Sequence, residues 1–74
     1  MNKFIVITDM REAVGVEEQV GRKVLINVNH IESIDGVEAH IAEVLNYRAV
    51  VITSSGRHYF ASEYQADIMN LINA

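Results

Sequence analysis

The sequence contains no cysteine and no proline. Without cysteine, neither a disulfide framework nor a cysteine-ligated zinc site can stabilise so short a chain. Stability must then come from good packing or from another copy of the chain. The 74 residues hold no proline-rich linker and no convincing repeat, so the sequence predicts a single small domain, 1–74.

Positive charge is also scarce, with six Lys and Arg against ten Asp and Glu and a formal net charge of −4. Nucleic-acid affinity depends largely on Lys and Arg neutralising phosphates. The basic residues are scattered, and only Arg22 and Lys23 are adjacent. The charge pattern therefore argues against nucleic acid as a partner.

Long apolar runs are missing. The N-terminal run Phe4–Ile7 is followed closely by Asp9 and Glu12, which does not fit a signal peptide. No stretch approaches the roughly 20 apolar residues that span a bilayer. We expect a soluble, cytoplasmic protein with no membrane insertion, and the absence of cysteine fits a reducing compartment.

The chain does contain five runs that read as strands, several of them dense in β-branched residues: 3–8, 22–28, 30–35, 47–53 and 57–61. Ser54-Ser55-Gly56 lies between the last two runs and predicts a tight turn, because glycine takes positive φ without strain. These patterns predict an α+β fold built on a small antiparallel sheet of four or five strands.

A helix is predicted from Ser62 to Ile72. Ser62 is the expected N-cap, and Gln65 three residues later completes a capping box. Loss of the cap in Ser62→Ala would then cost about 1 kcal/mol. The apolar positions that follow at helical spacing are Tyr64, Ile68, Met69, Leu71 and Ile72. Of these, Ile68 and Leu71 are expected to be buried against the sheet.

Two segments are less clear. Residues 9–21 read as an irregular connection. Residues 37–45 fit a helix, with Val37, Ile41, Val44 and Leu45 on one face and Asp35 as a possible cap, but a strand through 40–45 is the alternative. Propensity favours the helix slightly.

Several strands are apolar on both faces, which normally means that both faces are covered. The chain offers one clear helix, so a second copy is the economical cover, and a homodimer is predicted. Alternation alone cannot say which side of each strand points outward. The candidate interface residues are Ile5, Ile7, Leu25 and Val51.

Residues 23–34 and 51–63 resemble the small flagellar-motility proteins of the FlbD/SwrD type. The sequences of that family contain the pattern apolar-Asn-x-x-x-Ile-Glu-x-Ile, followed by a hairpin with one glycine and then by a helix. The layout is also similar to half of a LytTR-type β domain, a bacterial DNA-binding module. The positions that match the first pattern are Asn27, Ile31, Glu32, Ile34, Ile52, Gly56 and Ile68. The resemblance implies a small bacterial protein with an antiparallel sheet and a C-terminal helix. The chain departs from the pattern at 10–21, which replaces a tight hairpin, and at 36–46, which looks inserted.

No residue set predicts a reaction. His30, His40 and His58 lack the spacing of a metal site, and no nucleophile–base pair is visible, so we expect no catalytic, cofactor or metal site. The first hypothesis is a non-catalytic interaction or assembly module that forms homo-oligomers, with another protein as an alternative partner. The alternative is a LytTR-like accessory nucleic-acid-binding domain that uses Lys23, Arg48 and Arg57 near strand ends.

Overall fold

The computed structural model describes residues 3–10 and 21–74, and the irregular connection expected at 9–21 lies largely outside these ranges. In chain order the elements are β1 (Phe4–Asp9), β2 (Arg22–Asn27), the 3-10 turn η1 (Val28–His30), β3 (Ile31–Gly36), α1 (Ala39–Ala42), β4 (Ala49–Thr53), β5 (His58–Ala61) and α2 (Gln65–Asn73). The predicted α+β class and the five predicted strands are confirmed.

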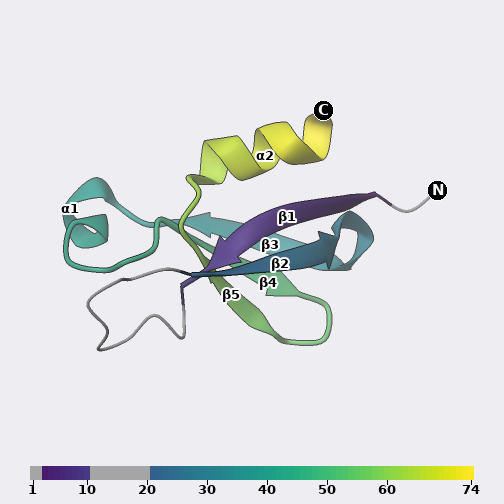
Figure 1. The fold of residues 1–74 in the computed structure, drawn as a ribbon, viewed down its shortest axis with the longest axis horizontal. Helices are drawn as coiled ribbons and strands as arrows, with labels where there is room; N and C mark the ends of the chain where they lie inside the picture. Colours follow the sequence, from purple (N-terminus) through teal and green to yellow (C-terminus); the bar gives the residue numbers. More distant parts are fainter. Residues whose placement is uncertain (1–2, 11–20) are drawn as a thin grey trace.

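The five strands form one antiparallel sheet in the order β2-β1-β5-β4-β3. The β1–β5 junction has a single registered pair, Asp9 with Ala61. Nearby backbone bonds extend it, because Met10 N–H donates to Phe60 (2.7 Å) and Ser62 N–H to Thr8 (2.9 Å). So short a junction lets the β1–β2 pair and the β3–β4–β5 unit curl toward one another, with α2 across the open side (Figure 1).

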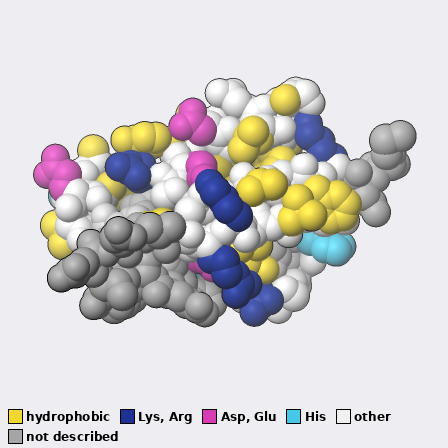
Figure 2. All heavy atoms as spheres, viewed as in Figure 1, with side chains coloured by type: hydrophobic (Ala, Val, Ile, Leu, Met, Phe, Trp, Pro, Cys, Tyr) yellow, Lys and Arg dark blue, Asp and Glu magenta, His cyan; other side chains and the backbone are white. Residues whose placement is uncertain are grey.

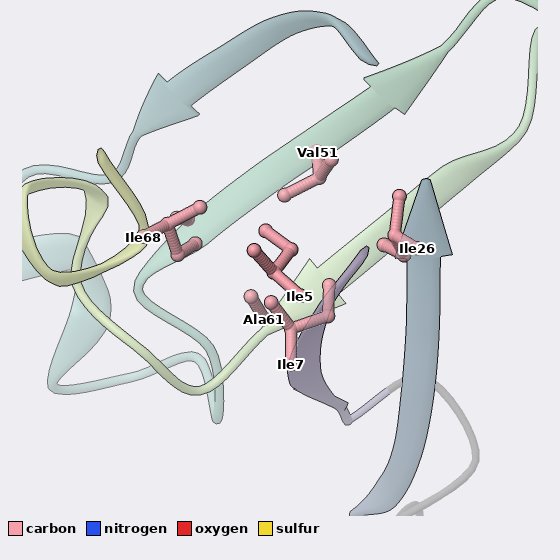
Figure 3. Close-up of a cluster of buried hydrophobic side chains, with 7 residues drawn as sticks. Ile5, Ile7, Ile26, Val51, Ala61 and Ile68 are labelled. Carbon is pink, nitrogen blue, oxygen red and sulfur yellow. The ribbon is translucent and has the colours of Figure 1, made fainter. Parts of the chain in front are cut away.

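The core fills the inside of this curl. Ile5 and Ile7 of β1 share a face with their partners Ile26 and Val24 of β2, because residues opposite each other in an antiparallel pair point the same way. Val51 and Ala61 reach the same centre from the other strands, and Ile68 of α2 closes it (Figure 3). Ile68 and Ile72, four residues apart, are the face of α2 that packs inward.

The turn at Ser54-Ser55-Gly56 is confirmed. Gly56 has φ of +83°, and it is the one described residue with positive φ. Its N–H donates to the carbonyl of Thr53 (2.9 Å), and Thr53 N–H donates to Arg57 (3.0 Å). The hairpin that connects β4 to β5 therefore depends on a glycine at this position.

The predicted capping box is wrong. Helix α2 begins at Gln65 with Tyr64 as its N-cap residue, and no side chain caps it. The backbone of Ser62 is held in the sheet instead, since its carbonyl accepts from Arg48 Nη1 (3.1 Å) and its N–H binds Thr8. Gln65 Nε2 donates to the carbonyl of Ile34 (2.7 Å). Tertiary hydrogen bonds thus occupy both residues, and Ser62→Ala has no cap to remove.

Segment 37–45 contains a short helix, as the favoured alternative predicts, but α1 covers only Ala39–Ala42. The strand alternative is wrong, and the N-cap residue is Glu38 rather than Asp35. The expected apolar face is not buried, because Val44 is 85% exposed. Helix α1 lies beyond one end of the sheet and leaves its outer face uncovered (Figure 1).

Burial along α2 generates the first prediction. Ile68 is fully buried, as expected, whereas Leu71 is 40% exposed, so its predicted burial is wrong. We expect Ile68→Ala to lower the free energy of unfolding by about 2–5 kcal/mol through lost apolar contact and a residual cavity. Leu71→Ala is the matched control and should cost much less. Urea titrations measure both, and equal losses would contradict this packing.

Candidate functional site

The outer face of the β1–β2 pair carries an exposed apolar cluster, Phe4, Val6 and Leu25, which we call the outer strip. These positions alternate with the core residues, and Val6 lies directly opposite Leu25. Their exposed fractions are 51%, 50% and 64%. Figure 2 shows hydrophobic side chains gathered on this side of the molecule beside Lys and Arg. Apolar side chains this close together and this exposed mark a candidate interaction surface.

Of the four predicted interface residues, only Leu25 lies on this face. Ile5, Ile7 and Val51 are 4%, 0% and 0% exposed and belong to the core. The expectation that they form an exposed interface is therefore corrected: the sheet curls around their side, and α2 covers it. The residues that the sequence analysis missed are Phe4 and Val6.

A polar network lies at the other end of this face, where β1 meets the link between β5 and α2. Glu63 accepts two hydrogen bonds from Thr8, at Oε1 from the backbone N–H and at Oε2 from Oγ1, both at 2.8 Å. Lys23 Nζ donates to the same Thr8 Oγ1 (2.8 Å). The Lys23 side chain therefore lies across the outer face toward β1 rather than projecting past β2.

Strand β2 is one edge of the sheet, and its hydrogen-bonding direction follows from one bond. Val28 N–H donates to the carbonyl of Lys3 (2.8 Å) just beyond the β1–β2 pairing. Because antiparallel bonding alternates along a strand, Val24 and Ile26 point their backbone groups at β1. The N–H groups of Lys23, Leu25 and Asn27 then point away from the sheet, as do the carbonyls of Lys23 and Leu25.

The opposite edge, β3, is obstructed. Val37 N–H donates to Arg48 (3.0 Å), so by the same alternation the carbonyl of Ile34 points outward. Gln65 Nε2 occupies that carbonyl, and Gln65 Oε1 lies 2.9 Å from where a Cβ on Gly36 would stand. The strand pairing also shifts register between Ile31 and Ser33. Bulges and covering side chains are the usual protection of an edge strand.

A cavity of about 350 Å³ lies beside β2, between that strand and the β4–β5 hairpin. Ile26 and Asn27 line it from β2, Thr53 and Ser54 from the hairpin, and Tyr59 from β5. Ile26, Thr53 and Tyr59 belong to the core side of the sheet. The cavity is thus an opening of the curled sheet next to the edge that β2 forms.

The three histidines lie on different elements: His30 in η1, His40 in α1 and His58 in β5. His40 Nε2 is 3.4 Å from Glu38, and both side chains are exposed. Within residues 3–10 and 21–74, no group of three or more His, Cys, Asp or Glu is placed to hold a metal ion.

The three basic residues of the nucleic-acid alternative come from three different segments of the chain. Lys23 of β2 binds Thr8 of β1. Arg48 stacks over the Tyr64 ring (5.0 Å) before β4, and Arg57 lies over the Tyr59 ring (5.8 Å) at the hairpin. Lys23 and Arg48 both reach the Thr8–Ser62 contact, since Arg48 Nη1 donates to the carbonyl of Ser62, whereas Arg57 lies at the β4–β5 hairpin. The three therefore do not form one continuous basic stripe, which is the arrangement that phosphate-binding surfaces use.

No match was found for the chain among protein-family models, curated proteins or solved structures. In the described part of the chain, no helix has the length and apolar character needed to cross a membrane.

The Thr8–Glu63 contact generates a second prediction. Glu63→Ala should lower the free energy of unfolding by about 1–3 kcal/mol, because the part-buried Thr8 N–H loses its acceptor. Glu63→Gln keeps one carbonyl oxygen and should lose less. Glu43→Ala, at an exposed glutamate, is the control. Thermal or denaturant midpoints test this, and a Glu63→Ala protein as stable as the parent would show that the contact is not stabilising.

Proposed function

We propose that this protein is a small, non-catalytic interaction module that works as a homodimer, joined through the outer strip and the neighbouring edge of β2. One observation carries the proposal: Phe4, Val6 and Leu25 form an exposed apolar cluster beside a strand edge that none of the described residues covers. Surfaces that combine these two features tend to associate, because burial of the side chains and pairing of the backbone both favour contact.

The magnitudes favour a reversible dimer. Full burial of one such side chain is worth about 1.5–3 kcal/mol, and the residues of the strip are already between one third and one half covered. Further burial then contributes roughly 1 kcal/mol for each side chain that the contact covers, at most three on each copy. This gain must exceed an association cost of about 4–15 kcal/mol, so backbone hydrogen bonds are also needed. A gain so close to its cost predicts weak, reversible association.

The non-catalytic part of the proposal is supported by the dispersal of chemically reactive groups. The histidines lie on three separate elements, and Ser62, Thr8 and Glu63 are engaged in hydrogen bonds that join the sheet to α2. These contacts give the polar residues a structural role. The proposal therefore places function on the outer strip and the edge beside it.

Sedimentation equilibrium tests the proposal. The parent chain at tens of micromolar should show a mass above that of the 8.3 kDa monomer and rising with concentration. Leu25→Lys places a charge at the centre of the interface and should give a monomer. Because Leu25 is largely exposed, the variant should keep its fold, which circular dichroism checks.

The matched control is Val44→Lys, which puts the same charge on a more exposed apolar residue next to α1. This variant should associate like the parent. A parent chain that stays monomeric at every concentration would overturn the proposed function. Equal loss of association in both variants would show that net charge, rather than the outer strip, controls the dimer.

A further inference from the structure

We propose that the second copy docks edge to edge: two β2 strands pair antiparallel about a two-fold axis at Leu25, so that the five strands of each copy join into one continuous sheet. This inference rests on the proposed self-association and specifies its geometry. It commits to another copy of this chain as the occupant of the β2 edge.

The backbone supplies the first support. Both backbone groups of Lys23 and Leu25, together with the N–H of Asn27, point away from β1. Pairing about Leu25 lets the two Leu25 residues exchange a pair of hydrogen bonds, and the N–H of Asn27 donates to the carbonyl of Lys23 in the other copy. The two-fold axis generates the same Asn27–Lys23 bond a second time with the two copies exchanged. One self-complementary edge therefore supplies the donors and acceptors of both copies.

The side chains select this register. A two-fold axis perpendicular to the sheet keeps the outer side chains of both copies on the same face of the joined sheet. Paired residues share a face, so an odd-numbered residue pairs with an odd-numbered one and an even-numbered residue with an even-numbered one. The numbers of two paired residues therefore sum to an even value. Centred on Leu25, the pairing sets leucine against leucine outside and Val24 against Ile26 inside. Centred on Val24, it would set Arg22 against the core residue Ile26. Only the first register matches apolar with apolar on both faces.

Charge agrees with the same register. Lys23 lies opposite Asn27 of the other copy and not opposite its own counterpart, so like charges do not meet across the axis. The Lys23 ammonium is also drawn toward Thr8 on the outer face, away from the edge (2.8 Å). An edge lysine ordinarily discourages pairing, and this contact reduces that effect.

The cavity beside β2 gives an independent reason for a strand at this position. A strand added at this edge directs alternate side chains to the core side, where the opening of about 350 Å³ is lined by Ile26 and Tyr59. In the register centred on Leu25, Val24 of the second copy comes opposite Ile26, at this opening. The added strand therefore extends the core instead of only lengthening the sheet.

Single-cysteine variants test the geometry, because the chain contains no cysteine and any disulfide must join two copies. In the proposed dimer the two Leu25 Cα atoms lie about 5.5 Å apart, within disulfide reach. Leu25→Cys should therefore form a covalent dimer readily under mild oxidation. The matched control is Val6→Cys, on the same face but one strand inward, where the two copies lie about 14 Å apart, three strand spacings.

A mixture fixes the register. Lys23→Cys and Asn27→Cys should cross-link with each other when mixed, and neither should cross-link alone, because each lies opposite the other across the axis. Cross-linking through Val6→Cys, or through Leu25→Cys without the mixed product, would overturn edge pairing but leave the proposed dimer in place. A parent chain that sediments as a dimer while no variant cross-links would also overturn this geometry. A monomeric parent would overturn both proposals.

Discussion

The structure depends on one constraint: a single nine-residue helix must help to enclose the core of a five-stranded sheet. Helix α2 cannot cover both faces, and α1 is too short and too far along the fold to help (Figure 1). The sheet meets the constraint by curling at the β1–β5 junction, so that its own strands enclose Ile5, Ile7 and Val51. The consequence is an outer face that no element of the described chain covers.

The same constraint makes the two edges of the sheet unequal. The link into α2 brings Gln65 to β3, where it occupies the carbonyl of Ile34. No comparable side chain reaches the β2 edge among the described contacts, and Lys23 turns inward to Thr8. Lys3, the residue before β1, donates a hydrogen bond from Nζ to the carbonyl of Ile72 (2.8 Å) and ties α2 to the sheet. The helix thus protects the β3 edge, and the β2 edge is the one that the proposed dimer would use.

Local patterns in the sequence were sufficient for the strands and for the turn at Gly56, because β-branched runs and a positive φ are local properties. They were insufficient where distant residues decide. Ser62 reads as a helix cap until Thr8 and Arg48 bind its backbone. For the same reason, alternation did not decide which side of each strand faces outward. The polar residues Lys23 and Asn27 lie on the same side of β2 as Leu25 and mark that side as the outer one. That signal would have led through the β1–β2 register to Val6 and Phe4.

Amide hydrogen exchange, followed residue by residue by NMR over a range of protein concentrations, tests the pairing of β2 most directly. The Ile26 N–H points at β1 within one chain and should be protected at every concentration. The Leu25 N–H points outward and should gain protection only as the dimer forms. Protection of Leu25 that rises with the dimer population is the predicted result. A Leu25 amide that exchanges freely while the protein is dimeric would contradict edge pairing.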